Sequence, residues 1–189
     1  MIRSLAAPLI GLVVMAGSAV SVDAGPISGM FGGDSTLTPT STPGVFIQAY
    51  TGDGSDATFG AFSVQSSSIV DFSHPPALLV ENGMFTETFS EGMLFGTSSG
   101  TGTTSGTGTG TATVDVTYTG GTGLFMDATG EATVLQSIIS TGPTTASGNA
   151  TYTGTLTLVP EPGSLALLAT AVLLFYRPRR SVKADSNSR

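Results

Sequence analysis

The sequence contains no cysteine and only one histidine among its 189 residues. Without cysteine the chain can form no disulfide, zinc–thiolate site or iron–sulfur cluster, and no thiol can act as a nucleophile. A single histidine, His74, cannot by itself build a histidine-based metal site. We therefore predict a domain that depends on its hydrophobic core for stability and that needs no cofactor.

Basic residues are missing from the whole central part of the chain. Its six lysines and arginines are Arg3, Arg177, Arg179, Arg180, Lys183 and Arg189. Residues 25–159 contain ten aspartates and glutamates and no basic residue, which gives this part a formal charge of −10. Because such a surface cannot neutralise phosphates, nucleic acid is excluded as a partner, and nucleotides and anionic lipids are disfavoured. The acidity can serve solubility alone, or calcium can bridge it to an acidic matrix.

The N-terminus has the three parts of a secretory signal peptide. A short basic start, Met1–Arg3, precedes an apolar run from Leu5 to Ala16. Val22-Asp23-Ala24 then offers tolerated residues for signal peptidase. We predict cleavage between Ala24 and Gly25, with Ala19 as the alternative site. An N-terminal membrane helix is the competing interpretation, but the apolar run is too short for it.

The residues between the two ends fall into two parts. Residues 25–43 are rich in glycine, serine, threonine and proline without sustained periodicity, which predicts a flexible lead-in. Residues 44–158 contain short β-type runs bounded by turn residues, with clear alternation at Val114–Tyr118 and Tyr152–Leu158. This period of two, with no helical window, predicts half-buried antiparallel strands. About eight strands suit a sandwich or a barrel, and we expect an all-β domain built as an antiparallel β-barrel.

Two segments inside this domain are predicted to lie outside regular strands. Thr51–Gly54 is expected to be the turn that ends the first strand. Gly96–Gly110 contains only glycine, threonine and serine. Because glycine-rich sequence is entropically costly to order, we expect a mobile loop there, or a poorly packed strand end.

The C-terminal part combines a proline-bracketed carboxylate, an apolar run and a basic cluster in fixed order. The carboxylate is Glu161, and the apolar run from Leu165 to Tyr176 precedes Arg177, Arg179 and Arg180. This arrangement resembles the PEP-CTERM sorting signal of exopolysaccharide-producing Gram-negative bacteria. The resemblance covers residues 159–180 and implies recognition by a membrane-embedded exosortase, which cuts near the motif and transfers the protein to the cell surface. The motif residues are Val159, Pro160, Glu161, Pro162, Gly163 and Ser164.

The physical properties of this segment agree with the resemblance. A helix over residues 163–176 would span about 21 Å, short of the roughly 30 Å hydrocarbon core, which suits a transient substrate. The arginines act as a stop-transfer signal and place residues 181–189 in the cytoplasm as a tail, with the rest of the chain outside. An ordinary single-span anchor with a proline linker is the alternative.

The central part has a resemblance of its own. Tyr118–Gly130 reads Y-T-G-G-T-G-L-F-M-D-A-T-G, and Asp56–Val64 and Glu91–Gly96 supply further matching segments. Together they resemble bacterial proteins with an allene-oxide-cyclase-like, calycin-type barrel, although Leu124 stands where an arginine is usual. The resemblance implies a barrel over about residues 45–158, and we expect the glycines to form turns with positive φ.

Four patterns bear on possible chemistry. Asp53 and Asp56 lie in an acidic turn and are weak candidates for calcium, although the EF-hand spacing is absent. Ser98 lies in a G-x-S-x-G pattern, but no helix follows it, so a serine hydrolase is disfavoured. Glu87 lies between Phe85 and Phe89, so it either points inward with a raised pKa or occupies a bulge or rim. Asn149 begins an N-glycosylation triplet.

These observations favour a non-enzymatic, exported protein at the cell surface or in the extracellular matrix, with a structural role associated with exopolysaccharide. Its expected partners are signal peptidase, an exosortase-type membrane protease, the inner membrane during transit, and exopolysaccharide. Two alternatives remain open. The first is a small apolar ligand-binding or cyclase-like barrel, and the second is a calcium-bridged adhesin.

Overall fold

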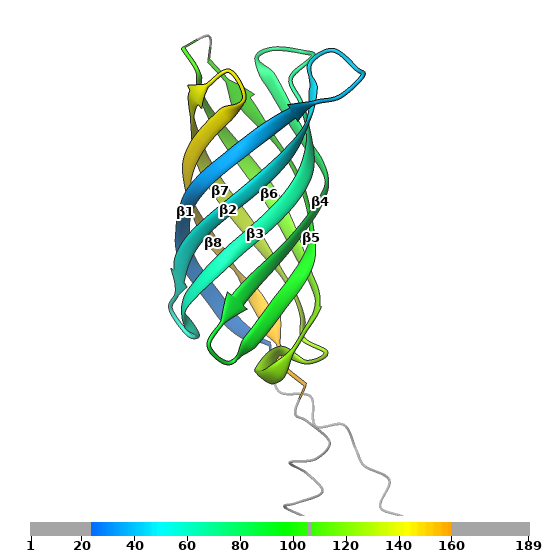
Figure 1. The fold of residues 1–189 in the computed structure, drawn as a ribbon. Coiled ribbons are helices and arrows are strands. Elements are labelled where there is room, and N and C mark those ends of the chain that lie inside the picture. The colour runs from blue at the N-terminus through cyan, green and yellow to red at the C-terminus, as the bar shows by residue number, and fades with distance from the viewer. Residues whose placement is uncertain (1–23, 106, 160–189) are drawn as a thin grey trace, which may run out of the picture.

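The chain forms one closed, eight-stranded antiparallel β-barrel, which confirms the predicted fold class. The computed structural model describes residues 24–105 and 107–159 (Figure 1). In chain order the strands are β1 Gly25–Pro39, β2 Val45–Asp56, β3 Gly60–Asp71, β4 Ala77–Phe89, β5 Gly92–Thr104, β6 Thr109–Gly121, β7 Thr129–Gly142 and β8 Thr145–Thr157. A short 3₁₀ helix, η1 Gly123–Phe125, lies between β6 and β7.

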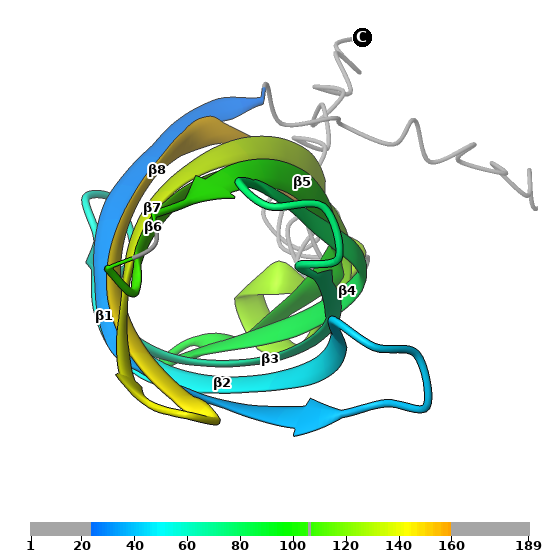
Figure 2. The same cartoon turned by 90° about the horizontal axis from the view of Figure 1, so that it is seen from above.

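Each strand pairs with its neighbours in sequence, and β1 pairs with β8 to close the barrel (Figure 2). Because a closed barrel has no free edge, every strand of the described chain has two partners. The hydrophobic cluster also lies entirely between Ile27 and Leu158. Residues 24–159 therefore carry a closed set of strand pairings and a continuous hydrophobic cluster, and they can be studied as a folding unit.

The prediction of a flexible lead-in over residues 25–43 was wrong for most of that segment. Gly25–Pro39 is β1, and it pairs along its length with both β2 and β8. Its inward positions include buried Ile27 and half-buried Phe31 and Leu37. Glycines at other inward positions hide this alternation, because a glycine carries no apolar side chain that a sequence pattern could register.

Two further local predictions need correction. Thr51–Gly54 does not form a turn, since β2 continues through it to Asp56 and the turn lies at residues 57–59. The glycine-rich tract from Gly96 to Gly110 forms the end of β5 and the start of β6, with a short connection between them. Threonine points outward and glycine inward along this part of β5, so the Gly-Thr alternation is itself a period of two.

Several glycines inside the barrel face aromatic rings. A Cβ on Gly29 would lie 2.7 Å from the hydroxyl oxygen of Tyr152, and a Cβ on Gly96 would lie 2.8 Å from Cζ of Phe85. The same relationship holds between Gly52 and the hydroxyl of Tyr50, at 2.6 Å. Glycine is thus needed at these positions because a neighbouring ring fills the space that a side chain would take.

A β-bulge in β4 determines which of its side chains face the interior. The pairing register with β5 shifts between Val80 and Gly83, where Asn82 has φ of 50°. Leu78 is buried before the bulge, whereas Phe85, Glu87 and Phe89 are buried after it. The extra residue therefore changes the inward parity from even to odd numbers and turns Glu87 into the barrel.

No helix in the described ranges is long and apolar enough to cross a membrane. The predicted signal peptide 1–24 lies outside these ranges except for Ala24. The predicted helix 163–176 and tail 181–189 also lie outside them, as do the motif residues from Pro160 onward and the stop-transfer arginines Arg177, Arg179 and Arg180.

Candidate functional site

The interior of the barrel contains a cavity of about 310 Å³. Its walls are mainly apolar and come from strands around the barrel, with Val64, Val70, Leu78 and Phe85 among the buried lining residues. The cavity extends to the turns that join β5 to β6 and β7 to β8, where Ser105 and Pro143 are exposed. We call this the open end of the barrel.

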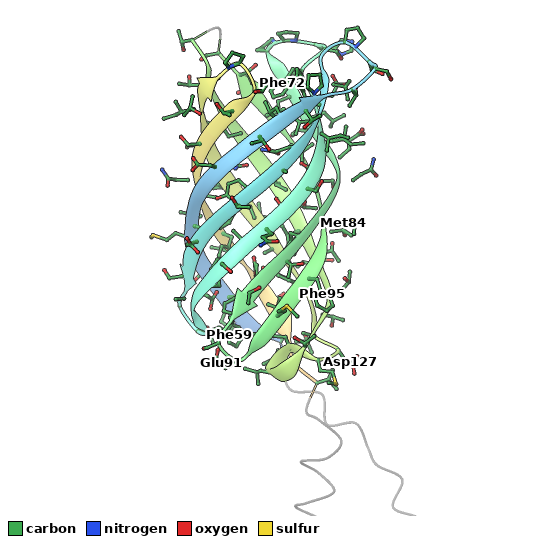
Figure 3. The ribbon with its side chains drawn as sticks, in the orientation of Figure 1. Phe59, Phe72, Met84, Glu91, Phe95 and Asp127 are labelled. Atoms are coloured by element: carbon green, nitrogen blue, oxygen red, sulfur yellow. The ribbon has the colours of Figure 1, made fainter. Side chains whose placement is uncertain are left out.

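The opposite end, which we call the closed end, is filled by aromatic rings. Phe125 of η1 is fully buried, with ring centroids 5.0 Å from Phe59 and 5.1 Å from Phe89. Phe62 continues the stack, 5.1 Å from Phe89. Figure 3 shows Phe59 at this end, and the chain enters β1 and leaves β8 there as well (Figure 1). The cavity is therefore a pocket with a single mouth. This mouth lies at the open end, away from the side where the chain enters β1 and leaves β8.

The glycine-rich segment between β6 and β7 shapes the closed end. Gly123 has φ of 60° and Gly120 has φ of 155°, both in the region that favours glycine. The value at Gly123 confirms the expected turn-forming role for that residue, whereas Gly120 and Gly121 lie in β6 and Gly130 lies in β7. The two positive φ values allow the chain to bend so that η1 places Phe125 across the end of the barrel.

Two carboxylates lie buried in the interior, Glu87 on the cavity wall and Asp56 beside the turn between β2 and β3. Asp56, at the end of β2, accepts hydrogen bonds from the backbone N–H groups of Thr58 and Phe59 at 2.7 and 3.0 Å. Its second oxygen accepts a 2.7 Å hydrogen bond from the hydroxyl of Tyr152. Asp56 therefore receives three hydrogen bonds from donors within the described chain.

Glu87 lines the cavity and is only 6% exposed, which confirms the inward orientation that was one of the two alternatives. Within the described residues its carboxyl group has no hydrogen-bond partner. Burial raises its pKa to about 8, and the negative charge of Asp56 contributes to the same shift. Glu87 is therefore mostly protonated at pH 7 and mostly ionised above pH 8.

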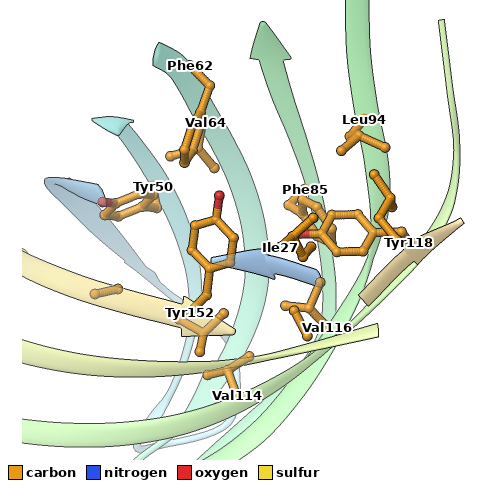
Figure 4. Close-up of a cluster of buried hydrophobic side chains, with 14 of the residues drawn as sticks. Ile27, Tyr50, Phe62, Val64, Phe85, Leu94, Val114, Val116, Tyr118 and Tyr152 are labelled. Atoms are coloured by element: carbon orange, nitrogen blue, oxygen red, sulfur yellow. The ribbon is translucent and has the colours of Figure 1, made fainter. Parts of the chain in front are cut away.

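Three tyrosines from separate strands point into the same interior (Figure 4). Burial raises the pKa of Tyr118 and of Tyr152, and for Tyr152 the hydrogen bond to Asp56 adds to the effect. Burial, together with Asp34 and Asp53, raises the pKa of Tyr50 to about 12. The Tyr50 hydroxyl is buried without a hydrogen-bond partner in the described residues. All three rings stay neutral at physiological pH and can act as hydrogen-bond donors and acceptors.

The interior negative charge has no cationic side chain to balance it. All lysines and arginines lie outside the described ranges, and His74 is exposed in the turn between β3 and β4. The imidazole Nδ1 of His74 lies 2.8 Å from the Ser73 hydroxyl oxygen. The pocket is therefore apolar in its walls and acidic within, an unusual combination for a buried site.

Other predicted site residues are not brought together. Asp53 is exposed on the outer face of β2 whereas Asp56 is buried on the inner face, so the two calcium candidates point in opposite directions. Among the described residues, no group of three or more His, Cys, Asp or Glu side chains could hold a metal ion.

The remaining predicted site residues are also separate from one another. Ser98 lines the cavity, away from the exposed His74. Asn149 is exposed on β8, and Ala24 and Gly25 lie at the start of β1.

The tyrosines of the pocket were missed as site residues. The sequence pattern identifies Tyr118 and Tyr152 only as members of alternating strands. The central part contains three tyrosines, and all three are buried at inward positions of their strands. Inward strand positions occupied by tyrosine are thus the signal that could have found them.

Comparison with protein-family models, with curated proteins and with solved structures gives no match for this chain. The fold and pocket define a closed antiparallel barrel with a one-mouthed, acidic interior cavity.

Proposed function

We propose that the protein is an exported barrel that binds a small, mainly apolar ligand in its interior. The observation that carries this proposal is the cavity of about 310 Å³, open at one end and closed at the other by Phe125. Ligand pockets typically have apolar walls with a few placed polar groups. Here Glu87 and Tyr50 are such groups, and both have unused hydrogen-bonding capacity in the described residues.

The export and sorting steps belong to the same proposal. A signal peptide over residues 1–24 and a PEP-CTERM-like segment over residues 159–180 would deliver the barrel to the cell surface through signal peptidase and an exosortase. Because β8 ends at the closed end, a C-terminal membrane segment would leave from that side. The mouth of the pocket would then face away from the inner membrane during transit.

The outer surface supports a second candidate function, association with exopolysaccharide. Exposed threonines face each other across β5 and β6, with Thr101 opposite Thr113 and Thr103 opposite Thr111. Their hydroxyl groups can donate and accept hydrogen bonds with sugars. Co-sedimentation of the barrel with the exopolysaccharide, with and without a calcium chelator, separates direct binding from a calcium-bridged adhesin.

A ligand-binding experiment tests the first proposal directly. Residues 24–159 would be titrated with 1-octanol, whose nine heavy atoms suit a cavity with room for about ten water-sized groups. We expect a rise in the unfolding temperature that grows with ligand concentration, because binding to the folded state alone stabilises it. The tyrosine fluorescence of the barrel should change as well. The absence of both effects up to the solubility limit would rule out an apolar ligand pocket.

A further inference from the structure

The chemical class of the ligand follows from the charge balance of the pocket. Asp56 and Glu87 are both buried carboxyl groups, and no cationic side chain lies among the described residues to neutralise them. Asp56 has three hydrogen bonds from the protein, whereas Glu87 has none within the described chain. Glu87 and the unpartnered hydroxyl of Tyr50 are therefore the buried groups that a ligand could supply with hydrogen bonds.

The pairing register places further acceptors close to Glu87. Glu87 lies opposite Val64, two residues along β3 from Ser66, which in turn lies opposite Tyr50 of β2. Ser66 and Tyr50 both line the cavity, and the Tyr50 hydroxyl is buried and unpartnered within the described chain. A carboxylate and two hydroxyl oxygens on adjacent strands form an acceptor-rich patch in a mainly apolar cavity.

We propose that this patch binds the ammonium group of a small alkylamine, with the apolar chain of the ligand lying along the cavity toward the open end. The inference rests on the proposed ligand-binding function. An alkylammonium group has three N–H donors and a positive charge, so it can satisfy Glu87 and neutral acceptors together. The bound cation supplies the counter-charge that the described part of the protein lacks.

The same geometry excludes the commonest lipophilic anions. A fatty acid would bring a second carboxyl group to the cavity wall beside Glu87, within the electrostatic influence of buried Asp56, with no arginine or lysine in the described residues to receive it. Like charges at short range in a medium of low dielectric constant repel strongly. A neutral alcohol can enter, but it cannot balance the charge of Glu87.

Three probes of equal chain length test the proposal by isothermal titration of residues 24–159 at pH 8.5. They are octylamine, 1-octanol and octanoate. At this pH an alkylammonium group is still protonated. The pH is also above the pKa of Glu87, so its carboxyl group is mostly ionised. We expect octylamine to bind at least about tenfold more tightly than 1-octanol, and octanoate not to bind.

Two substitutions test whether Glu87 is responsible for the preference for octylamine over 1-octanol. E87Q keeps the size of the side chain and removes its charge, so it should lose the preference for octylamine over 1-octanol. E81Q makes the same change at an exposed position on the same strand, and it should bind all three probes as the wild type does. Equal binding of octylamine and 1-octanol, or an unchanged preference in E87Q, would overturn the amine proposal and leave the apolar pocket standing. If no probe binds, the proposed function fails, and the amine inference fails with it.

Discussion

The hydroxyl of Tyr152 in β8 donates a 2.7 Å hydrogen bond to Asp56 in β2, and Gly29 of β1 lies between the two residues. Gly29 is directly opposite Asp56 in one pairing and directly opposite Tyr152 in the other. Because glycine has no side chain, the tyrosine ring can lie across β1 and reach the carboxylate. The two residues that this bond joins are 96 positions apart in the chain.

Removing the hydroxyl of Tyr152 should destabilise the barrel. Y152F leaves Asp56 buried with one fewer donor, and hydrogen bonds to charged groups contribute about 1.5–3 kcal/mol. We expect the free energy of unfolding in urea to fall by about that amount. Y50F is the matched control, because the Tyr50 hydroxyl is buried without a partner in the described residues. It should be as stable as the wild type or more stable, and an equal loss in both variants would contradict the role assigned to the bond.

Gly29 should tolerate no side chain. In G29A the new Cβ would lie 2.7 Å from the Tyr152 hydroxyl oxygen and would also meet the carbonyl oxygen of Ser55. Overpacking of this kind costs about 1–3 kcal/mol, and displacement of Tyr152 would add the loss of its hydrogen bond. G25A is the control on the same strand, because a Cβ there has no atom within 4 Å. Thermal unfolding of both variants checks the prediction, and similar unfolding temperatures would refute it.

The sequence predicted the fold class well because strand patterns are local. Val114–Tyr118 alternates without interruption, and Tyr152 and Leu156 keep the same period on either side of Gly154; all of these residues lie in β6 and β8 with the expected inward side chains. β1 was missed because glycine occupies inward positions, such as Gly29, where an apolar residue would have revealed the period. The reason for those glycines is a ring from another strand, which a local pattern cannot show.

The candidate site was predictable only in part. The parity of Phe85, Glu87 and Phe89 indicated that Glu87 could point inward, and it does. The pairing of Asp56 with Tyr152 depends on barrel closure, which joins the first and last strands and has no signal in nearby residues. From the sequence Asp56 is interpreted as part of an acidic turn, whereas in the structure it is a buried carboxylate at the end of β2.

The stability of the barrel should fall as pH rises from about 4.5 to 8. Glu87 has a pKa of about 8 in the folded protein against an ordinary value of 4.5, so the folded state binds more protons in this range. Its contribution is fully present below pH 4.5 and is lost through pH 8, with a slope approaching about 1.4 kcal/mol per pH unit. E87Q should remove this slope, as measured by urea unfolding at a series of pH values.

The control for this pH effect is again E81Q, whose exposed carboxylate should leave the slope in place. The buried tyrosines do not interfere, because their raised pKa values keep them neutral throughout the range. Parallel pH profiles for E87Q and the wild type would show that Glu87 does not carry the effect.

The C-terminal segment should be removed during delivery to the cell surface. If an exosortase recognises Pro160-Glu161-Pro162, the intact mass of the surface protein should lack residues 1–24 and the residues that follow the sorting cut, including the arginine cluster. Substituting Glu161 by alanine should retain the C-terminal residues and keep the protein in the inner membrane fraction. S188A, in the same tail but outside the motif, should be processed normally.

The mass of the surface protein distinguishes sorting from anchoring, because the two outcomes leave different C-termini. The measurement is made on undigested protein, since trypsin would remove the basic tail. A second, trypsin-treated sample should still contain the whole barrel in one piece, because the chain has no lysine or arginine between Gly25 and Tyr176. Recovery of an undigested surface protein that still carries residues 165–189 would instead establish an ordinary single-span anchor.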